Sequence, residues 1–296
     1  MPSQPRIAAE TRRRLLLGRP ASYVVRAAKA AFFPIKGIWY FLRRPYFYPL
    51  FVGRLLPLSI ISLLVYFVLF TFAFLPQLAF LAIFQGWAAA CINATMLVLG
   101  EGLVVIQGIF EGFFVDECRV DVFDATLIEK GLIDLVAPQR ILFPDAPNPV
   151  KKLGKPTAPA EYQPWSLVQI VELIFFLPLN LVPYVGAPAF IMITGARLGK
   201  LSHHRWFKLR GLDKKAVKRD ISLRSWDYLW FGTVAMILEL CPILNFFFLL
   251  TTTAGAALWV VKIEERARIH VGRRITTEDL AAQGTLNEPV YRDNPV

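Results

Sequence analysis

Three long apolar blocks, at residues 55–115, 167–196 and 228–261, interrupt this chain, and nearly all of its positive charge lies between and around them. A backbone placed in hydrocarbon must satisfy its own hydrogen bonds, and a helix does so. About 20 apolar residues in a helix cover the ~30 Å hydrocarbon core of a bilayer. We therefore expect an all-α integral membrane protein.

The composition points the same way. Hydrophobic residues make up 55% of the 296 residues and aromatic residues 14%, which is more than a water-soluble domain of this size carries. The net charge of +11 would suit either nucleic acid or an anionic membrane surface. Because the basic residues flank the apolar blocks and form no domain of their own, we expect membrane lipids as partners and no nucleic acid.

The distribution of charge predicts the topology. Residues 1–54 hold eleven Lys or Arg and one acid, and residues 197–224 hold ten basic and two acidic residues. Lys and Arg next to membrane segments favour the cytosolic side. If both segments are cytosolic, each apolar block must enter the membrane and return as a helical hairpin. Both termini are then cytosolic.

Turn-forming residues lie within each block, at residues 75–77 around Pro76, at residues 178–183, and at Pro242 with Asn245. The first hairpin has arms of about 20 residues or more, enough to cross. The second has arms of about 14 residues, which is typical of a re-entrant or interfacial segment. The third has one short and one longer arm. We thus expect one long hairpin and two shorter ones.

The segments outside the hairpins divide the chain into three regions. We expect a basic disordered N-terminus at residues 1–22, a membrane domain at residues 23–265, and a polar tail at residues 266–296. The membrane domain begins with an interfacial amphipathic helix that is broken near Pro34. It also includes a Pro-rich segment at residues 143–164, which is expected to be a linker.

Two stretches are candidates for contact with anionic lipid, one just before the first block and the other at residues 199–224, which follow a helical period with a basic face. The residues expected at the membrane surface are Arg43, Arg44, Lys200, Arg205, Lys208 and Arg210.

Polar residues inside the apolar blocks are the other candidate site: Glu101, Glu172, Glu239 and Asn180. A charge at membrane depth costs roughly 2.5 to 3.5 kcal/mol, so such side chains either line an ion or anion path or form structural pairs. For Asn180, capping or bridging of helices is favoured over solute binding.

Gly195 and Gly255 stand among small residues in the later arms of the two shorter hairpins, and such faces let helices pack closely. They would also allow a homo-oligomer.

Catalytic patterns are scarce. His203 and His204 have no acid at the spacing of acyl-transfer enzymes, so we expect them to be structural. The three cysteines, Cys91, Cys118 and Cys241, form no CxxC pair, which indicates neither a disulfide framework nor a metal site. No phosphate-binding glycine loop, GxSxG or HExxH sequence is present. We expect neither enzymatic activity nor a cofactor.

Several segments resemble a known group of proteins: FPIKGIWYF at residues 33–41, NLVPYVGAP at 180–188, HRWFKLRGL at 204–212, WFGTVA at 230–235 and GAALW at 255–259. In this order, across about residues 30–265, they resemble the fungal outer-spore-wall and lipid-droplet membrane proteins. That group is similar to the wider family of etoposide-induced and CysZ-like membrane proteins.

The resemblance implies a multi-pass protein of the endoplasmic reticulum and lipid droplets, linked with spore wall assembly and without an established reaction. The CysZ-like relatives are sulfate permeases with shallow helical hairpins, but no anion-binding residues can be matched one by one to this chain. Two functions are therefore open: a non-enzymatic protein that organises lipid surfaces, or a solute or anion transporter.

Overall fold

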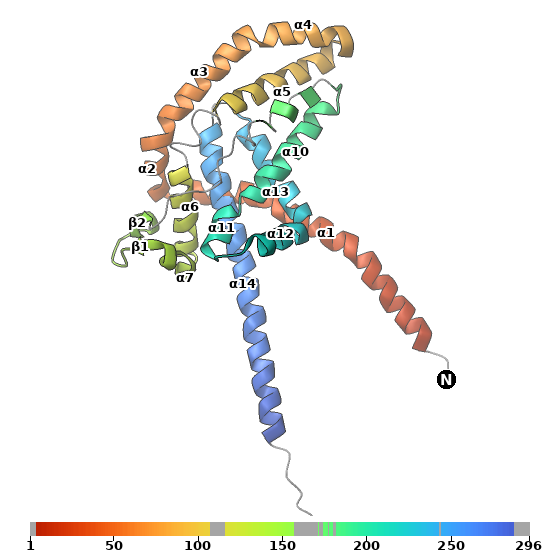
Figure 1. The fold of residues 1–296 in the computed structure, drawn as a ribbon, viewed down its shortest axis with the longest axis vertical. Helices are drawn as coiled ribbons and strands as arrows, with labels where there is room; N and C mark the ends of the chain where they lie inside the picture. The colour runs from red at the N-terminus through yellow and green to blue at the C-terminus, as the bar shows by residue number, and fades with distance from the viewer. Residues whose placement is uncertain are drawn as a thin grey trace, which may run out of the picture.

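The computed structural model describes residues 4–106, 116–156, 171, 174–176, 178–179, 182–242 and 244–286. The structure is 85% helix, which confirms the helical class expected from the apolar blocks. Long helices with reversals between them gather at one end of the molecule, and α1 (Gln4–Leu42) and α14 (Asn245–Leu286) extend away from the other end (Figure 1).

The first apolar block folds as an arc and a return helix. The arc consists of α3 (Leu56–Phe72) and α4 (Phe74–Gln85), which meet at Ala73, and α5 (Trp87–Ile106) runs back beneath them (Figure 1). The expected turn at residues 75–77 is wrong, because the chain reverses at Gly86, which has a φ of 75°. Glycine adopts this backbone conformation without strain. Pro76 is instead in the first turn of α4, where a missing N–H costs no helical hydrogen bond.

The turn at Pro183 and the end of α13 before Pro242 lie where the sequence places them. Residues 182–185 form the turn before α10 (Gly186–Leu201), with Pro183 inside it. The arm that precedes this turn lies largely outside the described residues. In the third block, α13 (Ser225–Glu239) ends just before Pro242, and Asn245 begins α14. Pro242 cannot continue a helix by donating a hydrogen bond, and it stands between the two.

Glycines set the closest helix contacts. A Cβ at Gly232 of α13 would overlap the carbonyl oxygen of Gly195 and lie 2.6 Å from the nitrogen of Gly199, both on α10. A Cβ at Gly255 of α14 would lie 2.5 Å from the carbonyl oxygen of Phe33 on α1. Both small-residue faces expected from the sequence are thus used within one chain, α10 on α13 and α14 on α1.

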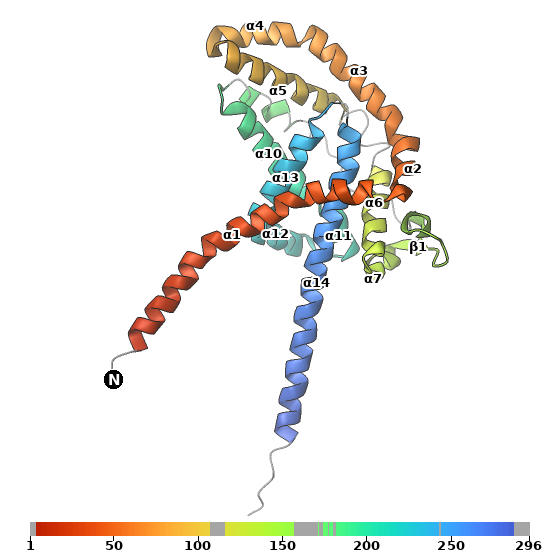
Figure 2. The same ribbon diagram turned by 180° about the vertical axis from the view of Figure 1, so that it is seen from behind.

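The helix α1 continues across Pro34, so the expected break there is wrong. Figure 2 shows α1 as one continuous helix that changes direction along its length. Phe33 is buried against this junction, and Gly37 approaches the backbone of Thr251. We attribute the continuity of α1 to this packing. The helices α1 and α14 run without interruption across the expected region boundaries near residues 22 and 266. The division into three regions stays a prediction.

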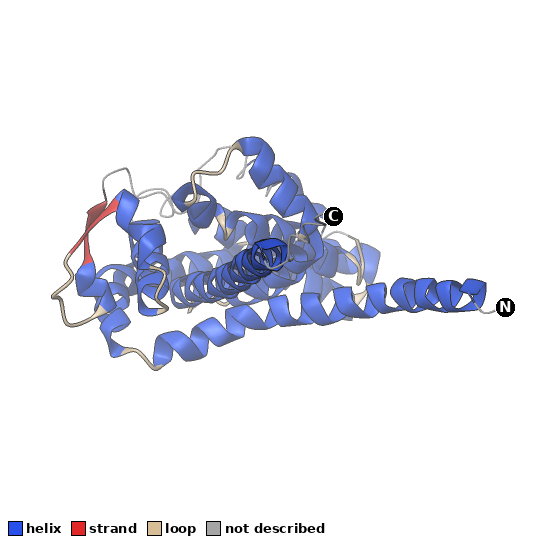
Figure 3. Ribbon diagram, turned by 90° about the horizontal axis from the view of Figure 1, so that it is seen from below, coloured by secondary structure: helices blue, strands red, loops and turns tan. Residues whose placement is uncertain are grey.

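Short elements connect the long helices. A 3-10 turn at Pro45–Phe47, α2 (Tyr48–Leu50) and a π-helical turn at Phe51–Leu55 lead from α1 into α3. The helix α6 (Asp116–Glu129) precedes α7 (Ile133–Val136), and α11 (His204–Leu209) precedes α12 (Lys214–Leu223). Seen from below, α14 is end-on near the middle of the molecule (Figure 3).

The Pro-rich segment is only partly a linker. Strands β1 (Arg140–Leu142) and β2 (Leu153–Pro156) pair antiparallel, with Arg140 opposite Pro156, and α8 (Pro149–Lys152) lies between them. The side chain of Asn148 caps α8 by accepting a hydrogen bond from the backbone N–H of Lys151. The segment expected to be a linker is therefore folded up to residue 156, and residues 157–164 lie outside the described part.

Length and composition identify the helices that could cross a membrane. Within the described ranges two qualify, Trp87–Ile106 and Asn245–Ile269. Pro45–Gly53 with Leu56–Phe72 would make a third if this pair, bent by 54°, is one span. In Asn245–Ile269, 72% of the most apolar 18-residue stretch is buried inside the protein, so it is a central helix surrounded by others. Among the described residues, α13 is too short to cross by the same measure.

Candidate functional site

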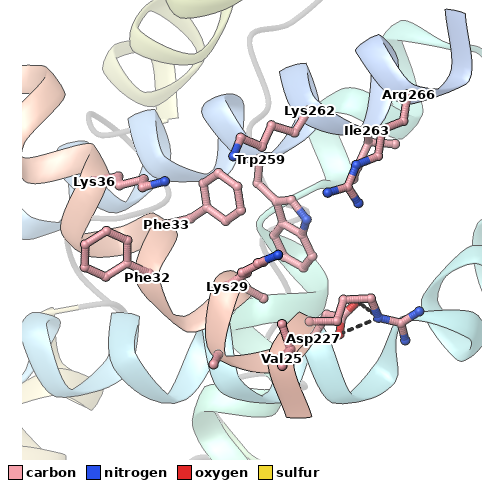
Figure 4. A pocket seen from close by; sticks show the side chains of 13 residues that line it. Val25, Lys29, Phe32, Phe33, Lys36, Asp227, Trp259, Lys262, Ile263 and Arg266 are labelled. Carbon is pink, nitrogen blue, oxygen red and sulfur yellow. Dashed lines mark hydrogen bonds and ion pairs between the residues drawn. The ribbon is translucent and has the colours of Figure 1, made fainter. Parts of the chain in front are cut away.

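A cavity of about 480 Å³ opens where α1 passes between α13 and α14, on the polar side of the hairpins. Figure 4 shows side chains from α1 and α14 pointing into it. We call it the basic crevice and define it by Lys29, Lys36, Lys262, Arg266 and the ring of Trp259. Because residues 255 and 37 are glycines, the two helix backbones meet beside this cavity and hold its two walls at a fixed separation.

The charges around the crevice are unbalanced. Lys29 and Lys36 stand two helical turns apart on α1, and Lys262 and Arg266 stand one turn apart on α14. Within the part of the chain that the structure describes, no ion pair forms to any of these four. The one carboxylate in the lining, Asp227, is already paired with Arg26 at 2.8 Å.

Aromatic rings form the floor of the crevice. Trp259 stacks on Phe33 with 6.0 Å between ring centroids, and the Lys262 ammonium lies 5.6 Å from the centre of the Phe33 ring. Below Trp259 lies the ring of His203, at 4.5 Å. Packed aromatic rings leave this floor little freedom to collapse into the cavity.

His203 itself belongs to the core. It is fully buried, and its Nδ1 lies 2.9 Å from the hydroxyl of Tyr228. Burial, together with the nearby Arg224 cation, lowers the pKa of His203 to about 3. The imidazole is therefore neutral near pH 7 and acts as a packed ring beneath the crevice.

Two further cavities adjoin the basic crevice. One, of about 820 Å³, continues past Arg266 toward α12 and is lined by Arg219 and Arg224. It shares Arg26, Asp227 and Trp259 with the crevice. The other cavity, of about 710 Å³, is almost wholly apolar and lies on the other flank of α1, with Ala28 common to both. We call it the apolar groove; its lining is Tyr23, Val24, Ala27, Ala28, Ala31, Trp226 and Trp230.

Buried ion pairs fix the helices around these cavities. Asp124 of α6 is fully buried and accepts hydrogen bonds from Arg205 at 2.7 Å and Arg140 at 3.3 Å. Glu264 of α14 accepts from Trp206 Nε1 at 2.6 Å and from Arg210 at 2.9 Å. These contacts join α6, α11, α14 and β1 on the polar side of the hairpins.

A second carboxylate anchors the end of α1. Glu129 accepts hydrogen bonds from Arg44, Tyr40 and Tyr46. Burial would raise the pKa of Glu129, but the hydrogen bonds from these three side chains outweigh burial and the pKa lies below its usual value. The Glu129 carboxylate thus stays charged at neutral pH and joins α6 to the start of the first hairpin.

The sequence-predicted intramembrane residues have separate partners. Glu101 accepts a hydrogen bond from Gln77 at 2.7 Å within the first hairpin. Glu239 is buried at the third reversal and accepts from Thr252 at 3.0 Å. Neither lines the three cavities described above. Glu172 and Asn180 lie outside the described residues.

The sequence-predicted basic surface is split by the structure. Arg43 and Lys200 are exposed, and Lys208 is half-buried. Arg44 pairs with Glu129 and Arg210 pairs with Glu264. Arg205 is buried against Asp124, so its guanidinium cannot contact lipid headgroups; the helical period correctly indicated a helix there but not which face the protein covers.

The crevice residues on α14 were missed by sequence reasoning. Lys262 and Arg266 belong to the segment at residues 262–296, which holds six basic and six acidic residues, and this balance hides them in a charge count. Lys29 and Lys36 are recognisable as the cationic face of an amphipathic helix. The four-residue spacing of Lys262 and Arg266 was the available sign that they share a helix face.

Comparison with known proteins adds no relative: no family model matches the chain, and neither curated proteins nor solved structures give a significant match. Among the described residues no group of His, Cys, Asp or Glu could hold a metal ion. What the fold defines is a mostly helical protein with two helices long and apolar enough to span a membrane.

Proposed function

We propose that this chain is a non-enzymatic multi-pass membrane protein that organises the lipid surface of the endoplasmic reticulum and of lipid droplets. The observation that carries the proposal is the outer face of the first hairpin. Large apolar side chains are exposed along it, including Ile60, Leu64, Phe67, Phe72, Ile83 and Phe84. An exposed apolar surface of this extent is typical of contact with lipid.

The polar elements support a one-sided arrangement. The β1–β2 sheet, α7, α11 and α12 all lie away from the hairpin tips, on the side toward which α1 and α14 extend (Figures 1 and 2). A protein whose charged parts face one side can occupy a bilayer or a phospholipid monolayer over neutral lipid. This supports the endoplasmic reticulum and droplet localisation that the resemblance implies, with a role in spore wall assembly as its wider expectation.

Transport of a solute or anion is the alternative that the resemblance offers. It would need the intramembrane carboxylates to line a path. Glu101 and Glu239 hydrogen-bond to different helices and line none of the three cavities described, so the geometry favours the lipid-surface role.

Cysteine labelling in sealed microsomes tests the topology. In a variant lacking the three native cysteines, Asp145→Cys in the exposed β1–β2 loop should react with an impermeant maleimide from the cytosolic side. Trp87→Cys, at the tip of the first hairpin, should react only after detergent is added. Protection of position 145 until detergent is added would overturn the one-sided arrangement.

Imaging decides the localisation. In cells fed oleate, the tagged protein should form rims around lipid droplets in addition to a reticular signal. Exclusion from droplets with a uniform plasma-membrane signal would contradict the proposal and favour the transporter, which sulfate flux into proteoliposomes would then measure.

A further inference from the structure

We propose that the basic crevice binds the phosphate-monoester headgroup of an anionic phospholipid, with an acyl chain lying in the apolar groove. This assignment rests on the proposed membrane function, because such a lipid reaches the crevice from a membrane surface. The lipid-surface role alone specifies neither this ligand nor this binding site.

The charge of the crevice selects the headgroup. Lys29, Lys36, Lys262 and Arg266 bring four cations to a cavity of about 480 Å³, and no ion pair among the described residues neutralises them. Cations held this close repel one another unless an anion lies between them. A phosphate monoester carries about −1.5 to −2 charges at pH 7 and three strong acceptor oxygens, whereas a diester carries a single charge.

The geometry of the side chains agrees with that choice. In Figure 4 the ammonium of Lys29 and the guanidinium of Arg266 lie on either side of the ring of Trp259. The ammonium of Lys262 lies beside the neighbouring ring of Phe33. These cations come from two helices whose backbones are in contact at Gly37 and Gly255, so the fold fixes the separation of the two helix faces that carry the cations. Asp227 does not repel an anion in the crevice, because its carboxylate is paired with Arg26.

The apolar groove distinguishes a lipid from a soluble phosphate. It follows the neighbouring flank of α1, shares Ala28 with the crevice, and is bordered by Trp226 and Trp230 of α13. Val24 on the same helix is 68% exposed, so this flank of α1 is not covered by the protein itself. A headgroup in the crevice places the glycerol end of a lipid beside Ala28, from which a chain can follow the groove.

Lipid binding by the purified full-length chain in neutral detergent tests the assignment. The probe is a fluorescent diacylglycerol phosphate, and its anisotropy reports binding. We expect saturable binding that is at least tenfold weaker for the corresponding phosphatidylglycerol, a diester, and absent for phosphatidylcholine. Equal binding of all three lipids would overturn the proposal.

Variants locate the site. The double variant Lys29→Gln/Lys262→Gln should weaken binding at least tenfold, and Lys29→Arg/Lys262→Arg should retain it. The matched control is Lys151→Gln/Lys152→Gln in α8, which removes two charges away from the crevice and should leave binding unchanged. Unchanged binding in the first variant, or equal losses in the first variant and the control, would contradict the assignment.

Competition identifies the source of the phosphate. Glycerol 3-phosphate and inorganic phosphate should displace the lipid probe only at concentrations at least a hundredfold higher than unlabelled diacylglycerol phosphate. Displacement at equal concentration would overturn the lipid assignment in favour of a soluble phosphate. Flotation of the wild-type protein with liposomes checks membrane embedding separately. If the protein floats but shows no preference for the phosphate monoester, only the headgroup assignment is overturned. If it fails to float, the proposed membrane function is overturned as well.

Discussion

At the scale of single residues, the polar side of this protein depends on carboxylates that are buried with their cations. Asp124 is fully buried between two guanidinium groups, and Glu264 holds Trp206 and Arg210 to α14. A buried ion pair adds little net stability over an apolar contact, but removal of one partner leaves a charge without compensation. Such residues are therefore sensitive points even where no ligand binds.

Asp124→Asn should be strongly destabilising. The change leaves Arg205 without its carboxylate and Arg140 with only Asp121, and loss of one partner from a buried pair costs about 3–5 kcal/mol. Thermal unfolding of the purified protein in detergent measures this as a lowered midpoint. Asp134→Asn is the matched control, because Asp134 pairs with Arg268 at an exposed site and should matter far less. Similar midpoints for the two variants would contradict the argument.

His203 should make stability depend on acid pH. Its pKa in the folded protein is lowered from 6.5 to about 3, so the unfolded chain binds more protons between these values. The stabilising effect of the neutral imidazole is fully present above pH 6.5 and is lost as the pH falls toward 3. The slope contributed by this one group reaches at most about 1.4 kcal/mol per pH unit.

Comparison with His203→Phe isolates that contribution. Other groups titrate in the same range, but they are common to both proteins, so the difference between the two stability profiles reports His203. The wild-type protein should lose stability relative to the variant as the pH falls below about 6.5. Parallel profiles from pH 7 to pH 4 would show that the histidine is not held neutral by the fold.

At the scale of elements, the helices approach one another most closely at glycine residues. The α10 and α13 helices meet through Gly195, Gly199 and Gly232, and α14 meets α1 through Gly255 and Gly37. Small residues allow the backbones to approach, which is how helices associate where no hydrophobic effect drives them together.

Gly232→Ala should therefore destabilise the fold although alanine favours helices. The new Cβ would overlap the backbone of α10, which cannot rotate away, and overpacking typically costs about 1–3 kcal/mol. Gly53→Ala is the control, since a Cβ there meets nothing within 4 Å. We expect the unfolding midpoint to fall for the first variant and to stay or rise for the second. A Gly232→Ala protein as stable as wild type would show that α10 and α13 can separate without loss.

The elements also show what a sequence can and cannot predict here. The turn at Pro183 and the end of α13 before Pro242 were predictable, because proline disfavours a continuing helix by a local effect. Pro76 was misleading, since proline is tolerated in the first turn of a helix, and Pro34 was overruled by the packing of Phe33 and Gly37 on α14. The four cations of the crevice could not be assembled from the sequence, because Lys29 and Lys262 meet only through the tertiary contact of α1 with α14.

At the scale of the whole molecule, the chain separates by chemistry along its long axis. Exposed apolar side chains cover the arc of α3 and α4, and the ion pairs, the sheet and the basic crevice lie toward the other end (Figure 1). The two ends meet along α14, which is apolar from Asn245 to Val261 and charged from Lys262 onward. This separation is what the proposed one-sided arrangement at a lipid surface requires.

The central position of α14 also bears on how the protein is made. Ribosomes deliver the chain from its N-terminus, so α1, the first hairpin and α10 to α13 are all present before the helix that most of them enclose. Until residues 245–269 arrive, the flank of α1 at Phe33 and Gly37 has no partner. Before that point the nascent chain would expose this unfilled seam to chaperones and degradation machinery, so synthesis of α14 would itself be the step that closes the fold.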